Sequence, residues 1–276
     1  MRLLERQNAC EYRLTDNLID RDIPRYAILS HTWGRDTEEV DFEDMMAGSG
    51  RNKTGYNKIE FCGERAAGDD LKYFWVDSCC IKKSSSAELS EAIISMFRWY
   101  NRAAKCYVYL SDVFIGENDV QQSQSIWEPA FRASKWFTRG WTLQELLAPI
   151  SVEFFSSDCK RLGDKESLKL QIQEISGIDI QALQGSPLSE FTIVERMRWA
   201  AKRVTKLEED RAYCLVGIFG VSMAAQYGEG RESAFKRLRS KIDKASDRKS
   251  PISRPERSSN LDSHSMYSLT NATTYK

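Results

Sequence analysis

The chain has 276 residues, of which 41% are hydrophobic and 11% aromatic, enough for one large domain or two small ones. Its 40 Lys and Arg residues equal its 40 Asp and Glu residues, so the basic surplus expected of a nucleic-acid-binding or anionic-membrane-binding protein is absent. Seven cysteines without framework spacing indicate reduced thiols and a cytoplasmic protein.

No part of the sequence resembles a membrane span or a targeting segment. The longest apolar candidate, residues 213–223, is about half the length that a transmembrane helix needs, and glycines interrupt it. Residues 1–6 lack the apolar core of a signal peptide. We therefore expect a soluble protein without a membrane span.

The first part of the chain predicts strands that alternate with helices. Residues 2–5 and 11–14 predict a hairpin. Short apolar runs that predict buried strands occupy residues 26–30, 71–77, 105–110 and 151–155. Apolar residues at helical spacing predict helices at 57–67, 87–104 and 141–147; Ser85 and Glu88 predict a capping box for the second, and Pro149 stops the third. This alternation predicts an α/β fold in residues 1–160: an open, mainly parallel sheet flanked by helices.

Strand patterns fade after about residue 160. Segments that predict helices occupy residues 165–175, 191–203, 209–219 and 232–244. We therefore expect an all-helical extension at 161–245, packed on the α/β part. Residues 246–276 are rich in Ser, Thr, Arg and Asn, and we expect a disordered tail there because few apolar residues can offset the entropy lost on ordering.

Metal, phosphate-loop and thiol chemistry have little support in the sequence. The two histidines are His31 and His264, no CxxC or HxxxH spacing occurs, and neither a Walker A motif nor GxGxxG follows a strand. His31 could pair with Cys79 or Cys80 at the end of the next strand, but cysteines are more often packed than catalytic. No metal and no cofactor are expected.

Polar and aromatic residues gather instead at the predicted strand ends and in residues 134–149, SKWFTRGWTLQELLAP. In open parallel sheets, ligands bind outside the carboxyl ends of the strands. Glu145 beside tryptophans could stabilise the oxocarbenium-like transition state in which a pyridinium leaves a ribose, with no general acid. In the competing interpretation, Glu145 is a surface residue of an amphipathic helix and the tryptophans are core residues. Asp77 is then a helix cap or turn residue, and Arg139 is an exposed charge.

Several long blocks together resemble the heterokaryon incompatibility (HET) domain of filamentous fungi. They are residues 26–34 (YAILSHTWG), 73–83 (YFWVDSCCIKK) continuing to 112, and 134–149. Residues 199–203, 209–219 and 227–230 are similar to the helical extension that follows many such domains, so the resemblance covers about residues 1–245. One departure is that Lys82 and Lys83 stand where the family usually has an acidic residue followed by Gln or Lys.

The resemblance implies a cell-death effector in fungal non-self recognition, the innate immunity that underlies vegetative incompatibility. Many family members carry the domain at the N-terminus of a receptor with a nucleotide-binding oligomerisation module. No such module follows residue 245, so we expect a stand-alone or truncated effector. We expect it to self-associate and to have such a receptor as a possible partner.

A more distant resemblance links the order of features to Toll/interleukin-receptor (TIR) domains. The matching positions are Ser30, Asp77, Ser134 with Trp136, and Glu145 with Leu146. In TIR enzymes the corresponding glutamate is catalytic and NAD is the substrate, which implies a TIR-like or flavodoxin-like core and Glu145 as the catalytic residue. The implied substrate-binding residues are Ser30, Trp33, Asp77, Trp136, Arg139 and Trp141.

Two functions remain open from the sequence. The first is NAD cleavage on self-association. The second is a non-enzymatic death-signalling module that self-associates and recruits partners, in which Glu145 is a surface or salt-bridge residue.

Overall fold

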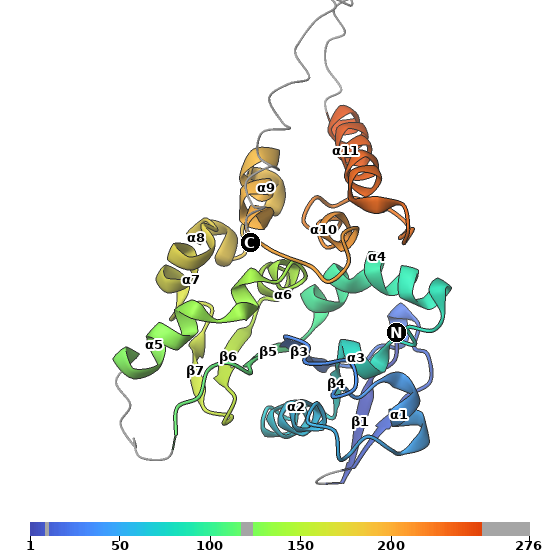
Figure 1. The fold of residues 1–276 in the computed structure, drawn as a ribbon, viewed down its shortest axis with the longest axis vertical. Helices are drawn as coiled ribbons and strands as arrows, with labels where there is room; N and C mark the ends of the chain where they lie inside the picture. Colours follow the sequence, from blue (N-terminus) through green and yellow to red (C-terminus); the bar gives the residue numbers. More distant parts are fainter. Residues whose placement is uncertain (9–10, 117–123, 250–276) are drawn as a thin grey trace, which may run out of the picture.

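The computed structural model describes residues 1–8, 11–116 and 124–249 (Figure 1). The disordered tail expected at 246–276 lies outside the described residues from position 250 onward, and His264 lies there too. Residues 246–249 contradict that expectation, since they belong to the last helix, α11 (Gly230–Lys249).

Seven strands of the described residues form one sheet in the order β2-β1-β4-β3-β5-β6-β7. Their bounds are β1 Leu4–Asn8, β2 Glu11–Leu14, β3 Tyr26–His31, β4 Tyr73–Trp75, β5 Lys105–Leu110, β6 Val152–Ser156 and β7 Arg161–Asp164. The central strands β4, β3, β5 and β6 are parallel, and the edge strands β1, β2 and β7 pair antiparallel. The predicted α/β fold with a mainly parallel sheet is confirmed.

The central strands follow the order second, first, third, fourth along the chain, as in flavodoxin-like sheets. The chain leaves β3 for β4 on one side and later returns to place β5 on the other. The direction of winding therefore reverses between β3 and β5, and loops that leave neighbouring strand ends there diverge and leave a crevice.

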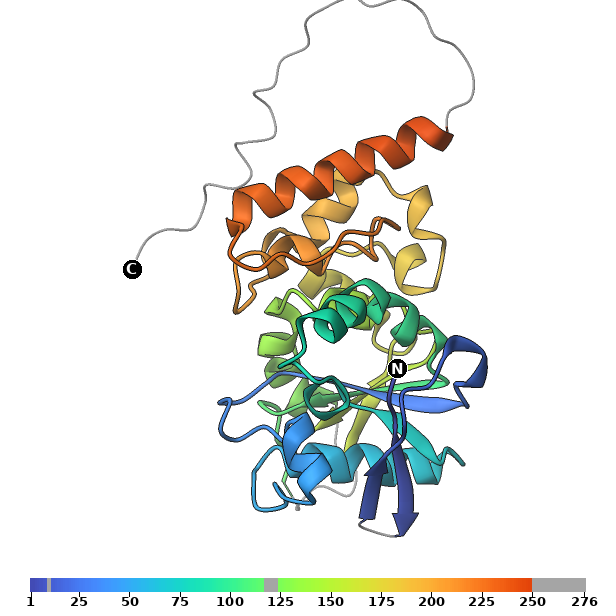
Figure 2. The same ribbon diagram turned by 90° about the vertical axis from the view of Figure 1, so that its right-hand side faces the viewer.

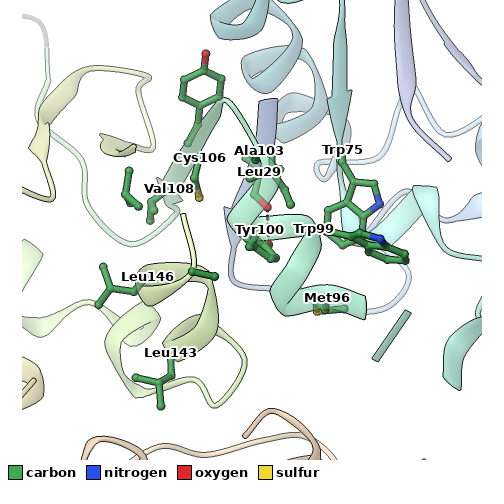
Figure 3. Close-up of a cluster of buried hydrophobic side chains, with 14 of the residues drawn as sticks. Leu29, Trp75, Met96, Trp99, Tyr100, Ala103, Cys106, Val108, Leu143 and Leu146 are labelled. Atoms are coloured by element: carbon green, nitrogen blue, oxygen red, sulfur yellow. Dashed lines mark hydrogen bonds between the residues drawn. The ribbon is translucent and has the colours of Figure 1, made fainter. Parts of the chain in front are cut away.

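Helices cover both faces of the sheet. Helix α2 (Tyr56–Gly68) packs on one face, and α4 (Ser86–Arg102) and α6 (Thr142–Leu147) lie on the other (Figure 1). Strand β5 is buried on both sides, which explains its continuous apolar sequence. Phe61 of α2 packs on Tyr107 and Tyr109, whereas Figure 3 shows Cys106 and Val108 in the cluster on the α4 and α6 side.

Aromatic packing joins α4 to the sheet. The Trp75 ring lies 5.6 Å from that of Trp99 and 5.9 Å from that of Tyr100, both edge-on, and the Tyr100 hydroxyl donates to the Leu29 carbonyl at 2.9 Å (Figure 3). At the start of α4, only one of the two hydrogen bonds of the expected capping box forms. Ser85 accepts from the Glu88 backbone N–H at 3.4 Å, but the Glu88 carboxylate contacts Arg2 and the Lys82 N–H instead of closing a capping box.

The C-terminal part is helical, as expected, and lies on the side of the sheet that carries α4 and α6 (Figures 1 and 2). Its helices are α7 Lys169–Ser176, α8 Ile180–Leu183, α9 Ile193–Ala201, α10 Asp210–Tyr213 and α11. The expected helix at 209–219 forms only as the single turn of α10, and turns follow it. None of the described helices is long and apolar enough to cross a bilayer.

Short elements complete the fold. They are η1 Asp20–Asp22, α1 Phe42–Ala47, α3 Asp77–Cys80, α5 Gln124–Ala133, η2 Lys135–Thr138 and η3 Leu188–Glu190. The strand expected at 71–77 is shorter than predicted, because Asp77 already begins α3. The sequence pattern does not predict strand β7, because it is a short edge strand that contains a glycine and few apolar residues.

Replacing Trp75 tests the aromatic packing. Trp75→Ala should lower the free energy of unfolding by about 3–5 kcal/mol, because the fully buried indole would leave a cavity between β4 and α4. Phe114→Ala, at a side chain that is 71% exposed, is the matched control and should change it by less than about 0.5 kcal/mol. Equal losses in urea titrations of the two variants would contradict this account of the core.

Candidate functional site

A cavity of about 850 Å³ lies at the carboxyl ends of β3 and β4, between the sheet and the helical extension. His31, Trp33 and Gly34 follow β3, and Asp77 begins α3 directly after β4. Helices α4 and α6 supply the wall on the other side, and residues after α9 close it. The cavity therefore occupies the crevice at which this type of sheet commonly binds ligands.

Glu145 of α6 reaches the cavity from within the core. It is only 6% exposed, and the Ser30 Oγ donates to its Oε2 at 2.5 Å. The indole Nε1 of Trp136 donates in turn to the Ser30 Oγ at 2.8 Å. Burial raises the pKa of Glu145 to about 8, although the Ser30 hydroxyl partly offsets the effect. The Glu145 carboxyl group is thus desolvated and fixed in place by neutral donors.

Asp77 has the opposite electrostatic environment. Burial alone would raise its pKa, but contacts with His31, the charge of Lys83 and a hydrogen bond from Trp33 lower the pKa to about 2. The His31 Nε2 and the Trp33 Nε1 each lie 2.9 Å from an Asp77 carboxylate oxygen. Of the four carboxyl groups that line the cavity, Asp77 is therefore ionised at pH 7 and Glu145 is mostly protonated, a separation that often accompanies distinct chemical roles; the other two are Asp36 and Asp210.

Lys82, which stands where the family usually has an acidic residue, and Lys83 beside it occupy different environments. The Lys83 Nζ lies 3.5 Å from the centroid of the Trp33 ring and donates to the Ser78 carbonyl, and burial lowers its pKa. Lys82 is exposed, with its Nζ 5.8 Å from the Phe42 ring centroid, and it does not line the cavity. The departure at Lys82 therefore lies outside the cavity, and the cation in the cavity is Lys83, at the position where the family often has Gln or Lys.

The extension contributes residues that the sequence did not single out. The Asp210 carboxylate accepts from the Trp141 Nε1 at 3.2 Å and from the Tyr227 hydroxyl at 2.9 Å. Arg203 donates to the Thr142 Oγ1 at 2.8 Å and so ties the start of α6 to the extension. The only sequence signal for Asp210 and Tyr227 was that both lie in blocks shared with the extension of the resembling family.

Five of the seven predicted site residues line the cavity: Trp33, Asp77, Arg139, Trp141 and Glu145. Ser30 and Trp136 do not, since both are fully buried behind Glu145. They lie behind the cavity wall, where Ser30 contacts both Glu145 and Trp136. The Trp136 ring packs edge-on against Phe137 and Phe154, so its remaining contribution is to hold Ser30.

The thiols near the cavity are not paired with the histidine. The Cys79 Sγ lies 3.9 Å from the Val76 carbonyl, and hydrogen bonding to Cys80 together with burial raises its pKa well above the ordinary value. His31 instead contacts Asp77. Within the described ranges, no group of three or more His, Cys, Asp and Glu side chains is arranged to hold a metal ion.

Comparisons with known proteins agree with this architecture. Residues 26–114 match the family model described as "Heterokaryon incompatibility protein (HET)". The chain is 57% identical over 244 residues to "Vegetative incompatibility protein HET-E-1" of Podospora anserina, an alignment that covers 88% of the chain but 18% of that relative. No solved structure matches the chain. Glu145 lies beyond the family-model match, which ends at residue 114.

The environment of Glu145 predicts an unusual pH dependence of stability. Because its pKa rises from about 4.5 to about 8 on folding, the folded state binds the proton more tightly, and the free energy of unfolding should fall as pH rises through that interval. Glu145→Gln removes this cost. The melting temperature of the variant relative to wild type should therefore be higher at pH 9 than at pH 5.

Glu174→Gln is the matched control, since its side chain is 62% exposed. Its melting temperature relative to wild type should be nearly the same at both pH values. The interpretation of Glu145 as desolvated would be contradicted if its substitution also had the same effect at pH 5 and pH 9.

Proposed function

Because the chain belongs to the HET-domain family, we propose that it is a cell-death effector of fungal vegetative incompatibility and that it cleaves NAD through Glu145. The observation that carries the enzymatic part is the desolvated Glu145 carboxyl group at the wall of a cavity that also holds the ionised Asp77 and two indoles. The role in incompatibility rests on the family and on the printed name of the relative, of which the chain spans 18%.

The proposed reaction breaks the bond between the ribose and the nicotinamide ring. The bonding electron pair leaves with the ring, so nicotinamide departs neutral and needs no proton from the protein. Positive charge develops on the ribose, where the Glu145 carboxylate stabilises it. Water then adds to the ribose and loses a proton, which gives ADP-ribose, nicotinamide and one proton.

Burial of Glu145 suits this role in a particular way. In the free protein at pH 7 the group is mostly protonated, because burial penalises the charged form. A bound pyridinium would favour ionisation of Glu145, since an opposite charge nearby lowers a carboxyl pKa. Ser30 and Trp136 hold the carboxylate without neutralising it, so its charge remains available to the transition state.

The mixture of charges around the cavity fits a dinucleotide. Asp77 supplies a negative charge for the cationic ring, and Lys83 and Arg139 supply positive charge for the diphosphate. Trp33 and Trp141, both partly exposed, offer indole surfaces for stacking, although the Lys83 ammonium covers one face of Trp33 in this conformation. We infer that Lys83 moves from the ring to the diphosphate on binding.

The proposal has three further parts: the protein self-associates, it acts alongside a receptor with an oligomerisation module, and it is cytoplasmic. Self-association and the receptor follow from the resembling families, and the cytoplasmic location follows from cysteines without disulfide-framework spacing. Clustering would raise the activity of an effector that is silent as a monomer, and loss of NAD would then kill the cell.

NAD consumption by the full chain, fused to a multimerising tag, tests the proposal. Wild type should hydrolyse NAD, and Glu145→Gln should reduce the rate at least about 100-fold, because removing one preorganised electrostatic group typically costs that much. Glu174→Gln should retain the wild-type rate. Turnover by Glu145→Gln would remove Glu145 from the mechanism. No turnover by wild type, with toxicity retained in fungal cells, would favour the non-enzymatic interaction module.

A further inference from the structure

A second cavity, of about 610 Å³, lies where the α/β part meets the helical extension. It shares no lining residue with the first, and α4 and α6 contribute to both. Phe97 and Asn101 of α4 form one wall, and the segment after α6 forms another. The remaining walls come from the segment after α8, from Arg196 of α9, from residues 217–220 and from α11.

One of the residues lining this cavity, Lys165, is a buried cation. It is 7% exposed, and its Nζ donates to the Pro149 carbonyl at 2.6 Å and to the Leu146 carbonyl at 3.4 Å. These carbonyls lie at the end of α6, where a cation is favourable. They satisfy two of the three ammonium donors. No ion pair within the described part of the chain includes Lys165, and burial lowers its pKa to about 8.

The second cation, Arg196, is half-buried. One guanidinium nitrogen donates to the Ile218 carbonyl at 3.1 Å, and the group lies 4.7 Å from the Phe219 ring centroid. Its Nε is buried and has no hydrogen-bond partner among the described residues. The described residues also offer it no carboxylate within 4 Å, and burial lowers its pKa. Ile218 and Phe219 both line the cavity, so the charged group is at its wall.

Other buried cations of this chain have either carboxylate partners or several neutral acceptors. Lys58, for example, forms an ion pair with Glu39 at 2.5 Å. The buried Arg203 donates to the Trp199 and Arg139 carbonyls and to the Thr142 hydroxyl. Burying a charge without an opposite charge is costly, and the cost is recovered when a counterion binds. Glu166, which follows Lys165 in the chain, is bound to Lys169 and Gln184 and does not line the cavity.

We propose that this second cavity binds a phosphate-bearing small molecule of about mononucleotide size, whose phosphate pairs with Lys165 and Arg196. Two cations that lack carboxylate partners match the charge of a phosphate monoester. The volume lies within the usual range for small-molecule sites. Phe97, Phe219 and Ile242 supply apolar surface for the rest of the ligand, and Ser186 and Ser189 supply hydroxyl groups at the wall.

Such a ligand would contact both parts of the molecule at once. Asn101 and Pro149 belong to the α/β part, whereas Arg196 and Phe219 belong to the extension. Binding should therefore hold the extension against the α/β part and raise the melting temperature. The proposal does not depend on any activity of Glu145.

Calorimetric titration of the full chain with AMP, with adenosine and inorganic phosphate as companion probes, tests the proposal. AMP should bind at least tenfold more tightly than adenosine and should raise the melting temperature. Lys165→Met and Arg196→Met should each weaken AMP binding at least tenfold. Lys169→Met removes a nearby cation that does not line the cavity, and it should leave the affinity unchanged.

Two further variants locate the site. Lys83→Met and Glu145→Gln alter the first cavity and should leave AMP binding unchanged; loss of binding in either would place the phosphate in the first cavity and overturn the proposal. Absence of binding by both AMP and inorganic phosphate to wild type would also overturn it. Without ligand, Lys165→Met should melt at or above the wild-type temperature, because the substitution removes a buried charge. The variant should therefore be folded, and if it binds AMP as tightly as wild type, the proposal is contradicted.

Discussion

The hydrogen bond between Ser30 and Glu145 is the interaction on which the candidate site depends. It joins the end of β3 to α6 across 115 residues of sequence, and Trp136 secures it from behind. Because burial penalises its charged form, the Glu145 carboxyl group is mostly protonated at pH 7 in the free protein, and its ionised form is available to stabilise a bound cation. Burial raises the pKa of Glu145, whereas contacts with His31, Lys83 and Trp33 lower the pKa of Asp77 despite its burial.

The helical extension is an integral part of both cavities. Asp210 accepts hydrogen bonds from Trp141 and from Tyr227 at the first cavity, and Arg203 donates to Thr142 at the start of α6. The second cavity lies between the extension and the far end of the same helix. Helix α6 thus connects the sheet, the catalytic candidate and the extension, so changes in the packing of the extension can reach Glu145 through a single rigid element.

Hydrophobic runs and helical periodicity in the sequence predicted much of the fold but only part of the candidate site. Strand β3 and helix α4 were predicted nearly to their ends, because burial on both faces and helical periodicity leave clear signals. Trp33 and Asp77 were placed together because parallel strands end at one edge. The contact of Trp141 with Asp210 could not be predicted, since nothing local specifies which distant carboxylate meets an indole. For the same reason, the sequence could not say that Trp136 faces Ser30 and not the cavity.

The protonation state of Glu145 tests the central claim most directly. Isotope-edited infrared spectroscopy of glutamate-labelled protein, as the difference between wild type and Glu145→Gln, resolves the carboxyl band of this one group. A protonated band at pH 6 that disappears with a midpoint near pH 8, and that shifts to lower pH when NAD binds, is the predicted result. An ionised Glu145 at pH 6 in the free protein would contradict the account, because the group would then be solvated or paired with a charge.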